Sequence, residues 1–185
     1  MMARWRRSAI TVLLVCAPLA RAQVNLPRGF EVLDIAVDEE YTGKPSINNC
    51  GQIVLAKANQ EIPPYGGDLW LYDNGRLTQI TAGTEDDDYP RINDLGDIAW
   101  RRYGFDTNRM QVILLRDGIE TVVKETSRVY DVEINNLAHL AWSEEHEGEC
   151  YVFDEDVYFW DGVAVVQVTT SEPYFDQSPA LNDFD

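Results

Sequence analysis

A short motif recurs along this chain at intervals of about 45 residues. It reads Pro-x-Ile/Leu-Asn-x-x-Gly. In the first three copies, Leu or Trp stands seven residues after the asparagine. The anchor asparagines are Asn48, Asn93, Asn135 and Asn182. Because several fixed offsets recur together, the chain is predicted to consist of repeats that stack to bury their apolar faces.

Each repeat predicts a turn and then strands. Proline fixes φ, asparagine hydrogen-bonds to nearby backbone, and glycine takes a left-handed conformation without strain. An apolar strand follows, then a polar connection of variable length, then a hairpin with an Asn-Gly or Asp-Gly turn. The connections cover residues 57–67, 101–109 and 143–155. Each unit is therefore predicted as an antiparallel meander of about three strands plus a short linking piece.

Units of this kind predict an all-β fold, a partial β-propeller with about three blades and a fourth begun. The predicted division is a cleaved signal peptide over 1–22, an N-terminal strand and lead-in over 23–44, and propeller-like repeats over 45–185. Within the repeats the units are 45–89, 90–131 and 132–178, with a stub over 179–185. Closed rings have roughly four to eight blades. We therefore expect either a longer protein, which we favour, or a second chain that completes the ring.

The first residues predict export. Three arginines precede a short apolar run, and Ala20-Arg21-Ala22 fits the small-x-small cleavage pattern, so the protein is expected in the periplasm or outside the cell. Two alternatives stay open: Arg6-Arg7 as a twin-arginine signal, and Leu13–Cys16 as a lipoprotein site with a bulky Val15. No later apolar run reaches the about 18 residues of a membrane helix.

The chain is strongly acidic, with 15 Lys and Arg against 32 Asp and Glu and a formal net charge of −17. Such a field repels phosphate backbones, so no nucleic-acid partner is expected. The hydrophobic share of 45% is enough for a packed core. Export permits a disulfide between Cys50 and Cys150, but they fall in different repeats, so whether they pair stays open.

The order Pro-x-Ile-Asn-x-x-Gly-x-Ile-Ala-Trp, then Asp-x-aromatic-x-(Tyr/Trp)-Asp-(Asn)-Gly, then Thr-Gln-Ile-Thr resembles the TolB-like, WD-like β-propeller repeat of secreted bacterial proteins. The resemblance covers about 45–185, and Ile-Asn-Asp-x-Gly stands where those blades have Ser-Pro-Asp-Gly. The resemblance implies a propeller fold. It does not imply one activity, because propellers of this kind serve as binding platforms, accessory domains or enzymes. The third repeat departs from the pattern, with Val132 for proline and Ala138 for glycine.

Chemical motifs are few. There is no Gly-x-Ser-x-Gly elbow, glycine-rich phosphate loop or Cys-x-x-Cys pair. His146 begins a zinc-protease-like run, but Cys150 occupies the place of the second histidine, so His139 and His146 are interpreted as ordinary residues. The tryptophans at repeat positions are interpreted as blade-to-blade core before ligand contacts. They are Trp70, Trp100, Trp142 and Trp160.

Two acidic runs are the candidate metal ligands, for Ca²⁺. They contribute Asp86, Asp87, Asp88, Asp154 and Asp156. Neither run has the alternating ligands and glycine of an EF-hand, so solvated loops are the preferred interpretation and no cofactor is expected.

The sequence predicts an exported, non-catalytic β-propeller segment that binds or scaffolds a protein or a glycan. Its site is expected at one end of the blade stack, in the variable connections. Two alternatives stay open: a propeller-type glycosidase or lyase, and a Ca²⁺-stabilised cell-surface protein.

Overall fold

The computed structural model describes residues 35, 43–58, 66–145, 155–170 and 175–183. The chain divides into a unit of residues 1–41 and a unit of residues 42–185, and the second holds the twelve described strands. The expected signal peptide and most of the lead-in lie outside the described residues. No helix among the residues described is long and apolar enough to cross a membrane.

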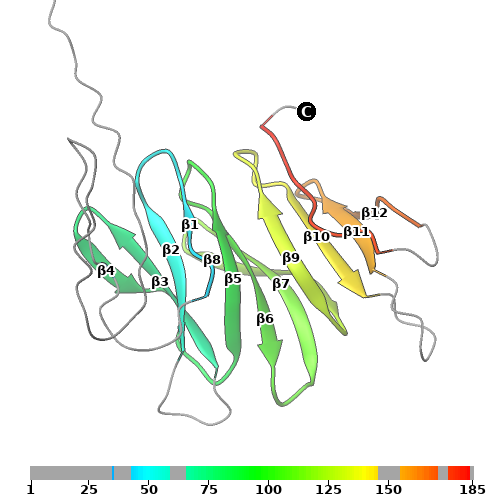
Figure 1. Cartoon of the computed structure of the whole chain (residues 1–185), viewed down its shortest axis with the longest axis horizontal. Coiled ribbons are helices and arrows are strands. Elements are labelled where there is room, and N and C mark those ends of the chain that lie inside the picture. Colours follow the sequence, from blue (N-terminus) through cyan, green and yellow to red (C-terminus); the bar gives the residue numbers. More distant parts are fainter. Residues whose placement is uncertain (1–34, 36–42, 59–65, 146–154, 171–174, 184–185) are drawn as a thin grey trace, which may run out of the picture. The chain divides into compact units, whose positions relative to one another are not determined.

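The strands form three sheets of four antiparallel strands, each sheet in chain order (Figure 1). Sheet 1 contains β1 (Ser46–Ile47), β2 (Ile53–Ala58), β3 (Gly67–Asp73) and β4 (Arg76–Gln79). Sheet 2 contains β5 (Asp86–Ile92), β6 (Ile98–Gly104), β7 (Arg109–Arg116) and β8 (Ile119–Thr126). Sheet 3 contains β9 (Val129–Ile134), β10 (Leu140–Glu145), β11 (Glu155–Trp160) and β12 (Val165–Gln167).

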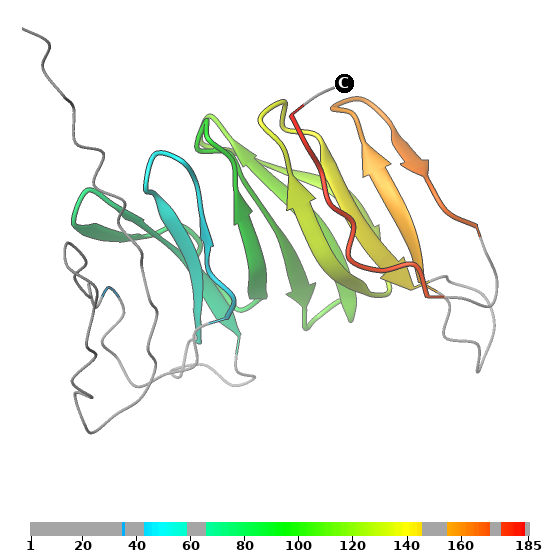
Figure 2. The same ribbon diagram turned by 45° about the horizontal axis from the view of Figure 1, so that its top comes forward.

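The three sheets stand one behind another like blades, as Figure 2 shows. Their first strands touch along one side: β1 contacts β5, and β5 contacts β9. We call these strands the inner strands. Consecutive meander sheets that share an inner side are blades, so the chain forms a partial β-propeller and the all-β prediction is confirmed.

Each blade has four strands where about three were predicted, because the short linking piece expected beside each meander forms a strand. In sheet 2 this strand begins with Asp86-Asp87-Asp88, which lacks the apolar alternation that identifies strands. The strand is stabilised instead by pairing with β6, where Asp87 lies opposite Arg102 and Asp88 opposite Arg101. The register shifts between Asp88 and Arg91, a bulge that accommodates a proline without a backbone N–H.

The first core cluster lies between sheets 1 and 2. Ile98 and Trp100 on β6 point back toward sheet 1 and pack with Val54 and Leu69. Trp100 is fully buried. The residue between them, Ala99, belongs to the other cluster, as the two-residue period of a strand requires.

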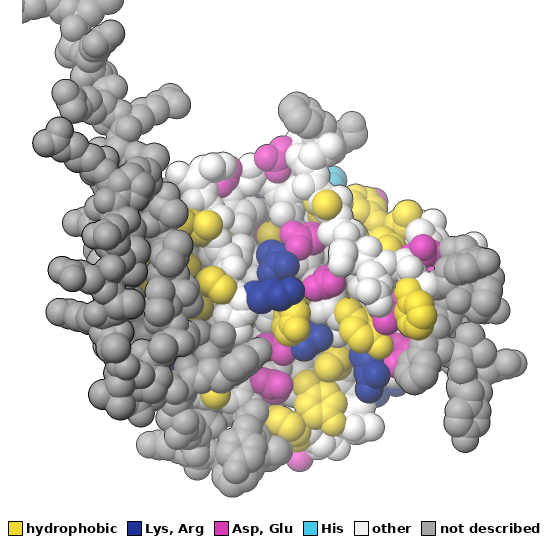
Figure 3. Space-filling model, viewed as in Figure 1, with side chains coloured by type: hydrophobic (Ala, Val, Ile, Leu, Met, Phe, Trp, Pro, Cys, Tyr) yellow, Lys and Arg dark blue, Asp and Glu magenta, His cyan; other side chains and the backbone are white. Residues whose placement is uncertain are grey.

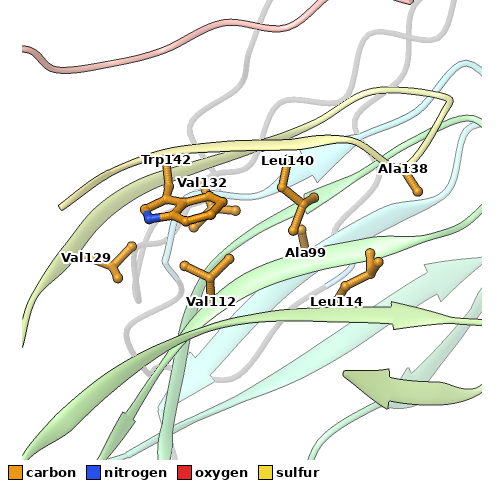
Figure 4. Close-up of a cluster of buried hydrophobic side chains, with 8 residues drawn as sticks. All are labelled: Ala99, Val112, Leu114, Val129, Val132, Ala138, Leu140 and Trp142. Carbon is orange, nitrogen blue, oxygen red and sulfur yellow. The ribbon is translucent and has the colours of Figure 1, made fainter. Parts of the chain in front are cut away.

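The second core cluster lies between sheets 2 and 3 (Figure 4). Val112 and Leu114 of β7 meet Leu140 and Trp142 of β10, and Trp142 is fully buried. Trp100 and Trp142 are therefore core residues, as interpreted from the sequence. Trp160 is half-buried against this cluster, and Trp70 is half-buried with the Lys57 ammonium 5.1 Å from its ring centre.

The repeated asparagine builds each turn. In sheet 2 the Asn93 Oδ1 accepts hydrogen bonds from the N–H groups of Leu95 and Asp97, at 3.0 and 2.9 Å. Asn48 and Asn135 do the same in their own turns. The sequence prediction that these residues are turn-builders is confirmed.

The same asparagines also join one blade to the next. The Nδ2 of Asn48 donates to the main-chain oxygen of Asn93 at 2.9 Å, Asn93 to that of Asn135 at 3.0 Å, and Asn135 to that of Asn182 at 2.9 Å. We call this series the asparagine ladder. These hydrogen bonds fix the position of each asparagine turn relative to the next turn. The residues they join are 45, 42 and 47 positions apart in the sequence.

Candidate functional site

The inner strands expose a surface of paired charges around one aromatic ring. We call it the inner surface and define it by Lys44, Tyr89, Arg91, Arg101 and Glu133. Figure 3 shows Lys and Arg side chains over the middle of the stack, interspersed with acidic and apolar ones. Four of its five residues come from the inner strands or the residues that lead into them, and Arg101 reaches over from β6.

Tyr89 has an unusual backbone. Its φ is +52°, in the left-handed region that costs a bulky residue roughly 1–2 kcal/mol. The conformation lets the strand bulge before Pro90 and leaves the phenol half-buried on the inner surface. The Arg101 guanidinium carbon lies 3.9 Å from the ring centre and the Lys44 ammonium 5.5 Å from it. Two cations therefore fix the ring by cation–π attraction.

Arg101 ties sheet 2 to sheet 3. Its Nη2 donates to Asp88 at 2.8 Å, and its Nη1 donates to the main-chain oxygens of Val129 and Tyr130 at 2.9 and 3.2 Å. Burial by itself lowers the pKa of Arg101, but the hydrogen bond and charge of Asp88 outweigh it and raise the pKa. The group therefore stays charged and fixed in place.

Arg91 and Glu133 form the second fixed pair. The Arg91 Nε lies 2.8 Å from the Glu133 Oε1, and the pair connects β5 to β9. Both side chains are partly exposed, at 21% and 29%, so they present a positive and a negative group to a ligand without being free to move. Neither residue was predicted as functional from the sequence. Their only signal there is position: Arg91 follows the motif's proline, and Glu133 follows Val132, which replaces proline in the third repeat.

The acidic residues proposed as metal ligands do not meet at one point. Asp87 is buried and accepts from Trp100 Nε1 at 2.8 Å and from Arg102 at 2.7 Å, whereas Asp88 points to the opposite face and pairs with Arg101. Asp86 accepts from the Gly67 N–H at 2.7 Å, and burial raises the pKa of Asp86.

Asp156 lies far along the chain, on β11, and accepts hydrogen bonds from Gln167 and Thr169. Asp154 lies outside the described residues. Within the described ranges no group of three or more His, Cys, Asp or Glu is placed to hold an ion. Calcium binding therefore stays a prediction.

A second polar cluster lies on sheet 3. Glu145 and Glu155 are directly opposite each other on β10 and β11, and Glu155 is only 5% exposed. Burial raises the pKa of Glu155, and the charge of Glu145 adds to the rise, while hydrogen bonds with Gln177 and Tyr130 oppose it. Among the described residues its Oε2 has no hydrogen-bond partner. No sequence motif indicated this cluster.

The remaining sequence candidates have ordinary surroundings. His139 lies in the turn before β10, with its ring centre 5.6 Å from that of Phe159. Cys50 is an exposed free thiol, while Cys150 and His146 fall outside the described residues. Ala138 takes φ +60°, the strained conformation expected where glycine is replaced.

The predicted binding connections are only partly described. The β6–β7 connection is short, because β6 extends to Gly104 and β7 begins at Arg109. The β2–β3 and β10–β11 connections lie largely in 59–65 and 146–154, outside the described residues. The antiparallel order places all three at the end of their sheets opposite the asparagine turns.

No protein-family model matches the chain, and no curated protein matches it significantly. Among solved structures it is similar to an acylaminoacyl peptidase from Pyrococcus horikoshii, with 22% identity, a TM-score of 0.47, and coverage of 69% of this chain and 23% of that one. It is also similar to the β-propeller domain of the Trilobed protease from Pyrococcus furiosus, with 10% identity, a TM-score of 0.43, and coverage of 70% and 57%. The chain thus spans less than a quarter of the peptidase's length.

Proposed function

We propose that this chain is part of an exported, TolB-like β-propeller protein and acts as a non-catalytic module that binds a protein or glycan ligand on its inner surface. The observation that carries the proposal is Tyr89, held at φ +52° on the inner strand of sheet 2. Strained residues of this kind concentrate at ligand sites, where the surrounding structure stabilises them.

The chemistry of the inner surface supports binding. An aromatic ring offers a flat apolar contact for a sugar ring or a side chain, and the neighbouring Arg91–Glu133 pair offers a donor and an acceptor at fixed positions. Because the asparagine ladder and Arg101 already fix the backbone, little ordering is needed when a ligand binds.

The same pairing favours a non-catalytic role. The guanidinium groups of Arg91, Arg101 and Arg102 each contact a carboxylate. Such neutralised pairs position a ligand, whereas catalysis usually relies on titratable groups whose pKa values are tuned toward the working pH.

The test is direct binding of two defined probe panels to the full chain: soluble neutral and acidic oligosaccharides, and random-sequence decapeptides. Tyr89→Asn removes the ring while keeping a residue that tolerates positive φ. Ile119→Asn is the matched control, because Ile119 lies on β8, the last strand of sheet 2, and is 67% exposed. We expect a ligand from one panel to lose at least tenfold in affinity with Tyr89→Asn and to be unaffected by the control. Equal affinity in all three proteins contradicts the inner-surface site.

A glycosidase is the second candidate, because of one observation. Glu155 is a buried carboxyl with a raised pKa directly opposite Glu145, and glycosidases pair a protonated acid with a second carboxylate. Hydrolysis of chromogenic aryl glycosides that disappears in Glu155→Gln supports this candidate. Absence of turnover by the unaltered chain contradicts it.

A further inference from the structure

Arg101 occupies a defined position in the repeat. It stands eight residues after the anchor Asn93 and lies opposite Val112 on β7. Its side chain points forward, toward sheet 3, where it donates to the main-chain oxygens of Val129 and Tyr130. These two acceptors stand six and five residues before the next anchor. One side-chain cation therefore joins sheet 2 to β9.

Sheet 3 has Ser143 at the equivalent position. Ser143 stands eight residues after the anchor Asn135. It lies opposite the valine of the third strand, Val157, in the same register as Arg101. Ser143 is 0% exposed, and its Oγ makes no hydrogen bond with any residue that the structure describes. The cation of the second repeat is therefore replaced in sheet 3 by a buried hydroxyl without a partner.

Three carboxylates lie beside this position. Glu145 and Glu155 are directly opposite each other and share the forward face of sheet 3 with Ser143, because side chains alternate along a strand. Glu155 is 5% exposed, and its Oε2 also has no hydrogen-bond partner among the described residues. Burial raises the pKa of Glu155, and the charges of Glu145 and Asp131 add to the rise. The three acidic groups therefore repel one another at close range.

One cation of the chain lies near these carboxylates. The Arg128 Nε is 3.6 Å from the Glu145 Oε2, and the Arg128 side chain is 51% exposed. Within the part of the chain that the structure describes, neither Asp131 nor Glu155 forms an ion pair. Three carboxylates therefore share one guanidinium, and the most buried of them has no counter-ion.

The main-chain acceptors of Arg101 also have counterparts here. Asp176 and Gln177 stand six and five residues before the anchor Asn182, which is the spacing of the two Arg101 acceptors before their own anchor. The Asp176 N–H donates to the main-chain oxygen of Glu155 at 2.8 Å, and the Gln177 side chain hydrogen-bonds to the Glu155 carboxyl. The segment that carries the equivalent oxygens is therefore held beside Glu155.

We propose that Asp131, Ser143, Glu145 and Glu155 form an acidic site that binds the guanidinium of an arginine side chain on a peptide ligand, in the place that Arg101 has in sheet 2. A guanidinium presents five N–H donors in one plane, so it pairs with several acceptors at once. Among the described residues no three acidic side chains are placed to hold a metal ion, which favours a broad planar cation over a compact one.

The acidic site is reached through its less buried members. Asp131 and Glu145 are half-buried, whereas Ser143 and Glu155 lie beneath them. The inference goes beyond the proposed function, because it depends on neither Tyr89 nor the ion pairs of the inner surface. It also gives Glu145 and Glu155 a role in binding instead of catalysis.

The test is a nuclear magnetic resonance titration of the full chain with three probes: N-acetyl-arginine amide, N-acetyl-citrulline amide and N-acetyl-lysine amide. Citrulline has the shape of arginine without its charge, and lysine has the charge without the planar group. Glu155→Gln removes the buried charge with little change of shape, and Asp131→Asn on β9 is a second, independent variant. Asp117→Asn is the matched control, because Asp117 lies in the exposed β7–β8 turn and asparagine tolerates its φ of +52°.

We expect the arginine probe to bind at pH 7 at least tenfold more tightly than the other two and to shift the amide signals of Ser143 and Glu155. Glu155→Gln is expected to weaken its binding at least tenfold and Asp131→Asn to weaken it in the same direction, while Asp117→Asn leaves it unchanged. Three outcomes each overturn the proposal: no saturable binding of the arginine probe, equal binding of the citrulline or lysine probe, and unchanged affinity in both Glu155→Gln and Asp131→Asn.

Discussion

The side-chain amide of Asn93 donates a 3.0 Å hydrogen bond to the main-chain oxygen of Asn135 in the next sheet. The same side chain accepts two N–H groups of its own turn. One buried residue therefore stabilises its own turn and fixes the position of the corresponding turn in the next sheet. This double use explains why the asparagine recurs in every repeat when proline and glycine do not.

Asn93→Ala is expected to destabilise the fold by about 2–4 kcal/mol, because it removes four hydrogen bonds and leaves buried backbone groups without partners. Urea unfolding measures the loss. Leu95→Ala in the same turn is the control, since Leu95 is 67% exposed and is expected to change stability by less than about 0.5 kcal/mol. Equal effects of the two substitutions contradict the role of the ladder.

Gly96→Ala is expected to cost about 1 kcal/mol through backbone strain alone. Gly96 has φ +87°, and an added Cβ meets only Gln52 Oε1 at 3.7 Å, an ordinary contact. The natural Ala138, at φ +60°, shows that this fold accepts alanine at that position. The reverse change, Ala138→Gly, is expected to be nearly neutral, because relief of strain opposes the loss of a buried methyl group. Thermal unfolding of both variants checks the pair. A loss well above 2 kcal/mol for Gly96→Ala indicates a steric clash instead.

Trp142→Ala is expected to destabilise the fold by about 3–5 kcal/mol, because the indole fills the second core cluster at 0% exposure. The substitution also removes the donor to Glu144 Oε2, which lies 2.8 Å from the indole nitrogen. Near-ultraviolet circular dichroism and urea unfolding report the loss. A change below about 1 kcal/mol is incompatible with a packed interface between sheets 2 and 3.

Stability is expected to depend on pH through Glu155. Its pKa is raised in the folded state, mainly by burial, so the folded protein holds a proton that the unfolded chain, near the ordinary value of 4.5, has lost. Between these two pKa values the folded state binds more protons, and its stability falls as pH rises. Glu155→Gln is therefore expected to raise stability at pH 7 and to flatten this dependence. An unchanged pH profile contradicts the assignment, and Asp156→Asn on the same strand is the comparison.

The repeat was predictable because local chemistry encodes it. The asparagine turn and the Asn-Gly or Asp-Gly hairpins act within a few residues, and the apolar strands between them follow a two-residue period. The inner strand beginning at Asp86 was not predictable, since its carboxylates become strand residues only when Arg101 and Arg102 lie opposite. The same holds for the inner surface. Tyr89 and Arg91 carry no functional signal in the sequence, because the bulge and the neighbouring blade determine where their side chains lie.

The sequence alone thus determined the turns, the period and the all-β class, because each depends on interactions between residues close in the chain. Only the tertiary structure decided which residues face one another across blades: the ladder of Asn48, Asn93 and Asn135, the Arg91–Glu133 pair, and the buried Glu155. These contacts join residues some forty positions apart or depend on burial, and a sequence pattern carries neither the distance between blades nor the exclusion of water.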